Sequence, residues 1–156
     1  MFQLRYQSYY YSTSQALPIL EELPEFAQVA FAFCRDWLAG QETFIQQTSG
    51  STGAPKLQVL SRTQMEASAA ATGAFFGTTT PGHLLCCLNP AYIAGKMMLV
   101  RALTMGWDLH VVAPDKDAIT QYDNTYDFAA MVPYQVYHTL NALDKIKKLI
   151  IGGGVI

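Results

Sequence analysis

Apolar and polar side chains alternate along the chain with two different periods, and these periods predict alternating helices and strands. Between residues 24 and 39, apolar side chains recur every three or four positions, the spacing of one face of an amphipathic helix. Pro24 suits the first turn of this helix, and Gly40 can adopt the left-handed conformation that ends it. Residues 43–47 and 57–60 are predicted to be two short strands on either side of a loop.

The alternation continues to the end of the chain. Ser61 and Gln64 have the spacing of a capping box, which predicts a helix to about residue 76. Strands that alternate with helices indicate an α/β fold with crossover connections, a largely parallel sheet and helices on both of its faces. The remaining predicted elements, in chain order, are a strand at 83–88, an apolar helix at 92–105, a strand at 108–112, a short helix at 115–121, a strand at 127–132, a helix from Pro133 to about 143 and a strand at 148–151.

Length and charge limit the classes of partner. The 156 residues are enough for one domain with a hydrophobic core. The 10 basic and 12 acidic residues give a formal net charge of -2, so we expect no broad basic surface for nucleic acid or an anionic membrane. The N-terminus lacks the order of a signal peptide, and no apolar run reaches the length of about 18 residues that a membrane span needs. We therefore expect a cytoplasmic protein.

The cysteines and histidines do not form a metal-binding pattern. Cys34 stands alone in a helical stretch, whereas Cys86 and Cys87 are adjacent, so that on a strand their side chains point to opposite faces. Small buried residues are the better interpretation of all three. The three histidines are scattered and match no ligand spacing, so we expect no metal site built from these residue types.

The stretch from Thr48 to Lys56, TSGSTGAPK, is dense in glycine and hydroxyl side chains and carries one lysine. Glycines let a backbone approach a ligand closely, and successive N–H groups form a concave anion site to which hydroxyls and an ammonium add donors. A flexible, solvated turn between two strands is the alternative. The P-loop pattern of nucleotide-binding proteins does not fit, because Pro55 and Leu57 stand where it requires Gly and Ser or Thr.

In its order of residues this loop resembles the phosphate loop of the adenylate-forming superfamily, which includes the acyl-CoA synthetases. Thr48 through Lys56 match without a gap, and Leu57 departs from the family's usual glycine. Residues 88–95 and 148–154 resemble two further segments of that superfamily. A base nine residues after the position of the family histidine makes the chain similar to the o-succinylbenzoate-CoA ligases of menaquinone synthesis.

The resemblance implies an acid-CoA ligase that adenylates a carboxylate with ATP and Mg²⁺ and then transfers the acyl group to coenzyme A. It implies that Lys56 is catalytic and that Tyr92, which replaces the histidine, and Arg101 contact the acyl substrate. Gly152, Gly153 and Gly154 would line a flat acyl pocket. The residues implied to hold the ATP phosphates are Thr48, Ser49, Gly50, Ser51, Thr52, Gly53 and Lys56.

Each of these site residues also has a structural interpretation. Tyr92 fits an amphipathic ring at a helix start, and Arg101 fits an ion pair with Asp or Glu at the edge of the core. The glycines at 152–154 fit a turn after a strand, and Lys96 is expected to be a surface or pairing residue.

The resemblance also implies that residues 1–156 are a partial N-terminal, AMP-binding domain. The metal-reaching acid, the ribose-binding Asp and the catalytic Lys of the family's C-terminal parts are expected beyond it, so we expect the chain alone to be inactive. A non-catalytic nucleotide- or phosphate-binding module and an aryl-acid CoA ligase of other specificity are the alternatives. A homo-oligomer is possible, and the partners expected are small molecules.

Overall fold

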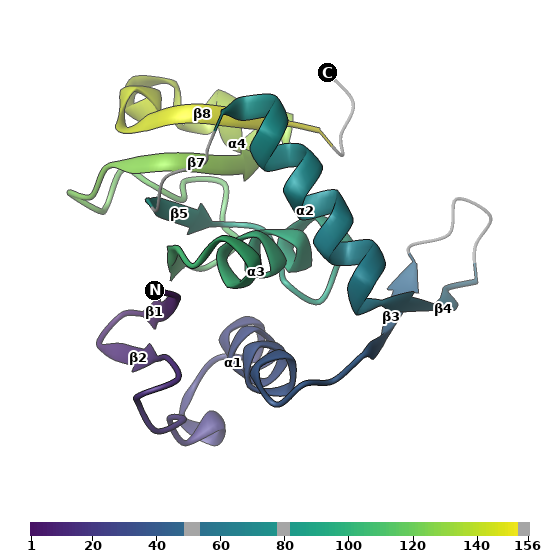
Figure 1. Cartoon of the computed structure of the whole chain (residues 1–156). Coiled ribbons are helices and arrows are strands. Elements are labelled where there is room, and N and C mark those ends of the chain that lie inside the picture. Colours follow the sequence, from purple (N-terminus) through teal and green to yellow (C-terminus); the bar gives the residue numbers. More distant parts are fainter. Residues whose placement is uncertain (49–53, 78–81, 153–156) are drawn as a thin grey trace.

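Six strands form one sheet in the order β2-β1-β6-β5-β7-β8 (Figure 1). The computed structural model describes residues 1–48, 54–77 and 82–152. The four strand pairs from β1 through β8 are parallel, and only β2 runs antiparallel, against β1. The strands are β1 (Gln3–Tyr6), β2 (Tyr9–Tyr11), β5 (His83–Cys86), β6 (Asp108–Val111), β7 (Tyr126–Met131) and β8 (Ile146–Ile151).

Helices cover both faces of this sheet, so the predicted α/β fold with a largely parallel sheet is confirmed. Leu84 on β5 points into the larger core, which contains buried residues of α1 (Glu25–Leu38), α2 (Arg62–Phe76) and α3 (Ile93–Met105). The adjacent Leu85 points into a smaller core on the other face. Side chains of the connection from β6 to β7 and of the short helices α4 (Pro133–His138) and η2 (Leu140–Lys145) fill that second core.

Strands β3 (Thr43–Thr48) and β4 (Lys56–Ser61) form a separate antiparallel hairpin, which projects beside α2 in Figure 1. Phe44 joins the hairpin to α1, because its ring stacks on Trp37 with centroids 5.7 Å apart. Ser61 then begins α2 as predicted: its Oγ accepts from the Gln64 amide at 3.1 Å, and its own amide donates to Gln64 Oε1 at 3.2 Å. The base of the hairpin is therefore fixed on both strands, against α1 through Phe44 and at the start of α2 through Ser61.

Two predicted helices differ from the structure. Residues 115–121 form no helix, because Asp117 Oδ1 accepts from the Thr120 amide at 3.1 Å and closes a local turn instead. The helix predicted from Pro133 to 143 ends at His138, where Thr139 interrupts it and η2 follows. The Thr139 hydroxyl donates to the Gln135 carbonyl at 2.6 Å, a bond that competes with regular helix geometry.

Strands β1 and β2 were not predicted. Their connection has no glycine, and Gln7 instead takes the left-handed conformation with φ 50°. A short 3₁₀ turn, η1 (Leu20–Glu22), leads on to α1. Among the helices in the described part of the chain, none combines the length and the apolar character needed to cross a membrane.

The cysteines are buried and free, as their positions in the sequence predicted. Burial raises the pKa of Cys86 and of Cys87 to about 12, so both are neutral thiols at physiological pH. No group of three or more potential metal ligands is present in the described ranges.

Candidate functional site

Two neighbouring parallel strands send their connections in opposite directions. From β5 the chain passes through α3 to β6 on one side, and from β7 it passes through α4 to β8 on the other side. Ligands of open α/β sheets bind in the crevice at the carboxyl ends of such strands. The candidate site therefore lies beyond Cys86 of β5 and Met131 of β7.

The β3–β4 hairpin is attached to this carboxyl-end edge. The side-chain amide of Gln46 on β3 donates to the Ala91 carbonyl, in the segment after β5, at 2.8 Å. Thr48 and Lys56 pair across the hairpin and bracket the loop. Lys56 is exposed to solvent at the loop's exit. Ser49, Gly50, Ser51, Thr52 and Gly53 lie outside the described residues.

Lys96 completes the attachment of the hairpin, and of the two roles expected for it, surface or pairing residue, the structure shows pairing. It is only 7% exposed, and its ammonium donates to Gln46 Oε1. Its Nζ also lies 5.6 Å from the centroid of the Phe33 ring. Burial lowers the pKa of the Lys96 ammonium. A buried lysine with a neutral amide partner thus ties α3 to the strand that enters the loop.

The segment from Asn89 to Tyr92 forms a tight turn at the carboxyl end of β5. The Ala91 amide donates to Asn89 Oδ1 at 3.0 Å, and the Tyr92 amide donates to the Asn89 carbonyl at 3.1 Å. A Cβ at Gly95 would collide with the backbone of Asn89, so only glycine allows this close approach of helix and turn. Tyr92 precedes the first turn of α3 and is 54% exposed, at the carboxyl-end edge of the sheet.

Arg101 has no acidic partner in the described part of the chain, so the structure gives no support to an ion pair there. Its Nη1 lies 3.2 Å from Met98 Sδ, and the guanidinium carbon lies 5.7 Å from the centroid of the Phe128 ring. Its Nε is buried and finds no hydrogen-bond partner among the described residues. Burial lowers the pKa of the Arg101 guanidinium. It is a cation held on apolar surface with part of its donor capacity unused.

Arg101 and Tyr92 are not brought together. They lie at opposite ends of α3, about 13 Å apart at a rise of about 1.5 Å per residue. Arg101 lines a cavity of about 10 Å³ with Leu84, Trp107 and Phe128, room for about one water molecule. An aromatic acid does not fit this cavity in the conformation observed.

Gly152 follows the last strand at the same carboxyl-end edge. Its amide donates to the Met131 carbonyl at 3.2 Å, and a Cβ built at Gly152 would meet open space. Gly153 and Gly154 lie outside the described residues. Of the predicted site residues, the structure places Tyr92 and Gly152 at the carboxyl-end edge of the sheet, and Thr48 and Lys56 at the ends of the two hairpin strands that adjoin the loop.

Gln135 is a positioning residue that the sequence analysis missed. Its Nε2 donates to the carbonyls of Cys87 at 2.8 Å and Asp115 at 3.1 Å, while its Oε1 accepts from the Val132 amide at 3.2 Å. This side chain bridges the carboxyl ends of β5, β6 and β7. A glutamine inside a short helix of mixed character gave no sequence signal. Lys96, a charged residue within an apolar run, did give one.

No protein-family model and no curated protein sequence matches the chain. A solved acyl-CoA synthetase (AMP-forming)/AMP-acid ligase II-like protein from Dyadobacter fermentans is 36% identical to it, with a TM-score of 0.82, and the match covers 92% of this chain and 42% of that one. The chain therefore spans less than half the length of this relative.

Two structures of o-succinylbenzoate CoA synthetase from Bacillus subtilis share the fold at lower identity. One, in complex with its acyl-adenylate intermediate, is 18% identical with a TM-score of 0.59, and the match covers 72% of this chain and 31% of that one. The other, in complex with ATP and a magnesium ion, is 19% identical with a TM-score of 0.57, and the match covers 72% and 25%.

The fold is thus that of a partial domain of an adenylate-forming enzyme. Its structural neighbours are adenylate-forming acyl-CoA synthetases, o-succinylbenzoate CoA synthetase among them, and they confirm the predicted resemblance to this superfamily.

Proposed function

We propose that this chain is the phosphate- and acyl-binding part of an ATP-dependent acid-CoA ligase. The observation that supports this most directly is the attachment of the TSGSTGAPK hairpin to the carboxyl-end edge of the sheet, through Gln46 and the Ala91 carbonyl. Through this bond the hairpin that carries the glycine- and hydroxyl-rich sequence contacts the segment after β5, at the edge where the strand connections diverge.

The proposed reaction has two steps. A substrate carboxylate attacks the α-phosphorus of ATP, giving an acyl-adenylate and pyrophosphate, and the thiol of coenzyme A then displaces AMP to form the thioester. Negative charge grows on the departing pyrophosphate in the first step. The loop amides, the hydroxyls from Thr48 to Thr52 and the Lys56 ammonium would stabilise that charge.

Magnesium would enter with the ATP phosphates and neutralise part of their charge. The hydroxyl groups between Thr48 and Thr52 are the oxygen ligands that the loop sequence could offer this ion.

For the acyl substrate we propose o-succinylbenzoate, whose second carboxylate would pair with Arg101. The unused Nε and the lack of an acidic partner in the described ranges support a ligand role for this guanidinium. The adjacent cavity holds only about one water molecule, so the aromatic ring would enter only if the side chains that line the cavity moved apart. A CoA ligase for a different acid is the second candidate function, because this cavity is too small for the ring of o-succinylbenzoate.

The test is carboxylate-dependent exchange of pyrophosphate into ATP by the full-length gene product, across a panel of aromatic and aliphatic acids. We expect exchange with at least one acid, and we expect Lys56→Ala to slow it by about 30- to 1,000-fold, equivalent to about 2–4 kcal/mol of transition-state stabilisation. Lys116→Ala, at an exposed position between β6 and β7, is the matched control and should exchange at the wild-type rate. Equal rates for Lys56→Ala and wild type would refute the phosphate role.

A further inference from the structure

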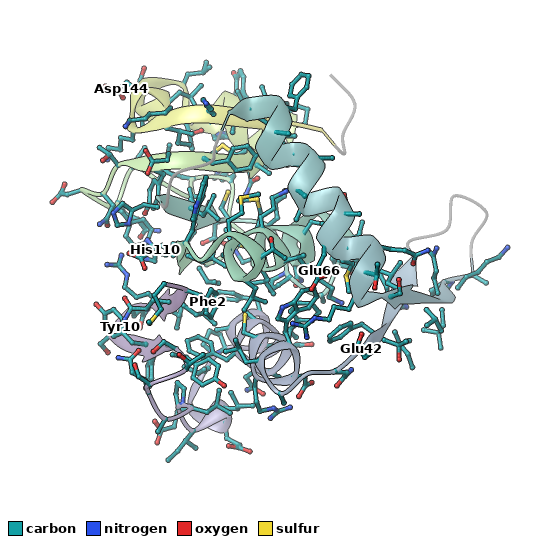
Figure 2. The ribbon with its side chains drawn as sticks, in the orientation of Figure 1. Phe2, Tyr10, Glu42, Glu66, His110 and Asp144 are labelled. Atoms are coloured by element: carbon teal, nitrogen blue, oxygen red, sulfur yellow. The ribbon has the colours of Figure 1, made fainter. Side chains whose placement is uncertain are left out.

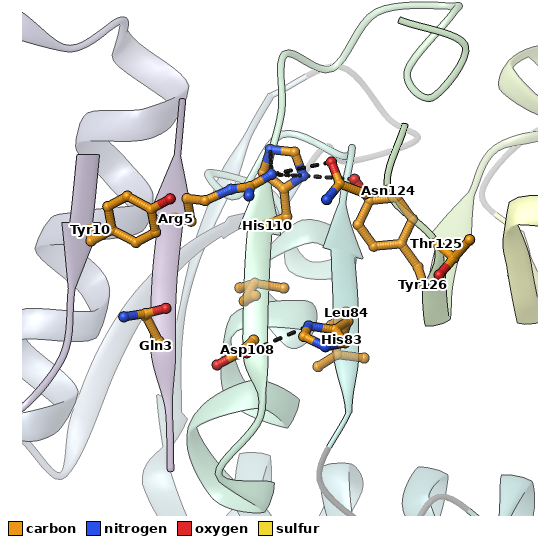
Figure 3. Close-up of a pocket in the computed structure, with 11 residues that line it drawn as sticks. Gln3, Arg5, Tyr10, His83, Leu84, Asp108, His110, Asn124, Thr125 and Tyr126 are labelled. Atoms are coloured by element: carbon orange, nitrogen blue, oxygen red, sulfur yellow. Dashed lines mark hydrogen bonds and ion pairs between the residues drawn. The ribbon is translucent and has the colours of Figure 1, made fainter. Parts of the chain in front are cut away.

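A polar cavity of about 410 Å³ opens on the face of the sheet opposite α1, α2 and α3, near the amino ends of the parallel strands (Figure 3). It takes its lining from β1, β2, β5, β6 and the start of β7. Its polar side chains include Arg5, Tyr10, Asp108, His110, Asn124 and Tyr126. The β3–β4 hairpin contacts the segment after the carboxyl end of β5, whereas this cavity is lined by His83 and Asp108, the first residues of β5 and β6, and by the segment that enters β7.

The register of the strands builds the cavity wall. Arg5 on β1 lies beside His110 on β6, and two residues earlier Gln3 lies beside Asp108. Residues two apart on a strand point to the same face, so these four side chains form two polar rows on one surface. The smaller core on this face, which α4 and η2 cover, includes Leu85 and Tyr126 but none of these four residues. The two polar rows are therefore not covered by it. In Figure 2, His110 lies to the left of α3, and Glu66 lies to the right, beside α2.

Arg5 is the main charge in this cavity, and its donors are poorly used. Its Nη2 lies 3.0 Å from both ring nitrogens of His110 and 3.4 Å from Asn124 Oδ1. A neutral imidazole accepts a single hydrogen bond, so His110 satisfies at most one of the five N–H donors of the guanidinium. The Nε of Arg5 is buried and has no partner in the described structure. Donors left unsatisfied away from water are costly.

The neighbouring groups do not neutralise Arg5. Burial, and then the Arg5 charge, lower the pKa of His110 to about 4, so the ring is neutral at pH 7. The Tyr126 hydroxyl oxygen lies at hydrogen-bond distance, 2.6 Å, from His110 Nδ1. Burial raises the pKa of the Tyr126 phenol to about 12. The acid in the lining, Asp108, lies one row away from Arg5 and pairs with His83 at 3.5 Å. No ion pair to Arg5 occurs among the described residues.

We propose that this cavity is a second ligand site, which binds the oxyanion group of a small organic molecule, a carboxylate or a phosphate, through the Arg5 guanidinium. Its volume lies within the range of about 300–1,000 Å³ typical of small-molecule pockets. The planar guanidinium can offer two parallel N–H donors to such a group, and Tyr10 and Tyr126 provide flat walls for the body of the ligand. The site is separate from the loop and does not depend on the proposed ligase activity.

The first test follows the Arg5 Nε–H signal of the 156-residue chain by NMR while sodium benzoate or sodium phosphate is added. Sodium chloride at equal ionic strength controls for screening. We expect a saturable shift with a millimolar dissociation constant for at least one of the two anions, and a loss of affinity of at least tenfold in Arg5→Gln, measured by calorimetry. Arg35→Gln removes an exposed arginine that pairs with Asp36 on α1 and should leave binding unchanged.

A pair of changes at Asn124 keeps the proposal testable even if Arg5→Gln does not fold. Asn124 is exposed and lies 3.4 Å from the guanidinium, so Asn124→Asp places a carboxylate beside Arg5 with almost no change of shape. We expect this variant to bind neither anion, whereas Asn124→Ala should bind within about threefold of wild type. Tighter binding of phosphate would assign a tetrahedral group to the ligand, and tighter binding of benzoate would assign a carboxylate. Shifts no larger than those with chloride, or unchanged affinity in Asn124→Asp, would overturn the proposal.

Discussion

The cations of α3, the buried Lys96 and the half-buried Arg101, have different partners and therefore different roles. Lys96 is bound by the amide of Gln46 and lies against the Phe33 ring, so it connects two elements. Arg101 lies on Met98 and Phe128 with an Nε that lacks a partner in the described ranges. Lys96 therefore belongs to the scaffold of the loop, while Arg101 keeps donor capacity for a ligand.

Removing Arg101 should cost the fold little. Arg101→Leu should change the free energy of unfolding by less than about 1 kcal/mol, because no ion pair is lost and a desolvated charge is removed. Arg62→Leu is the comparison, since Arg62 bonds the Trp37 carbonyl at 2.7 Å and Glu66 at 3.0 Å. That change should cost about 2–3 kcal/mol in a urea titration.

In the full-length ligase the same Arg101→Leu change should raise the KM for o-succinylbenzoate far more than the KM for benzoic acids without a second carboxylate. Only the dicarboxylate loses a charge partner, an effect of about tenfold or more for a charge-assisted hydrogen bond. Steady-state rates with both acids measure the ratio. An equal rise for both would show that Arg101 supports the fold instead.

Acid should destabilise the chain through His110. The folded-state pKa of about 4 lies below the ordinary value of 6.5, so the unfolded state binds more protons between these values, and stability is lost as the pH falls through this window. We expect a loss of about 2–3 kcal/mol from this group, somewhat less than the full shift implies because the ring adjoins an open cavity. Urea titrations from pH 7 to pH 4 measure the slope, and NMR follows the ring directly.

His110→Gln should flatten that slope, because it removes the titrating group. His138→Gln on α4 serves as the control and should retain it. A ring at position 110 that titrates near pH 6.5 in the wild type would contradict the prediction.

At the scale of elements, strands β3 to β8 and the long helices could be predicted from the sequence because each has a local sequence signal. The period of α1, the glycine after it and the capping box of α2 are all local. The helix expected at 115–121 failed because Asp117 found a turn partner in Thr120, and the β1–β2 hairpin was missed because Gln7 takes a conformation usual for glycine. For the site, sequence located the hairpin loop but not Gln135, whose partners come from distant segments.

Gly95→Ala should loosen the junction of α3 with the turn after β5. The added Cβ would meet the Asn89 and Leu88 carbonyl groups, and these are backbone atoms that cannot move aside alone. We expect a loss of about 1–3 kcal/mol in the free energy of unfolding. Gly152→Ala adds the same group in open space and should change stability by less than about 0.5 kcal/mol. A stable Gly95→Ala variant would mean that the turn is not fixed by this contact.

At the scale of the whole molecule, the chain corresponds to 42% of a relative's length, and the activity proposed here belongs to a larger assembly of parts. We expect the 156-residue chain by itself to release no AMP from ATP, Mg²⁺, coenzyme A and o-succinylbenzoate. A phosphate loop supplies only a share of the roughly 8 kcal/mol or more by which enzymes lower a barrier. Release of AMP at about 1 s⁻¹ or faster, within the usual range for enzymes, would show that the parts within residues 1–156 suffice.

The first strand of the sheet pairs with a strand made much later. Arg5 on β1 lies beside His110 on β6, 105 positions away. During synthesis at about 5–20 residues per second, β1 therefore leaves the ribosome roughly 5–20 s before its parallel neighbour exists. Through that interval β1 has β2 as its available partner within the sheet, and a lone two-stranded hairpin is at best marginally stable. The edge that carries Arg5 therefore cannot join the described sheet until β6 has been made, whereas the opposite edge waits longer still, for β7 and β8.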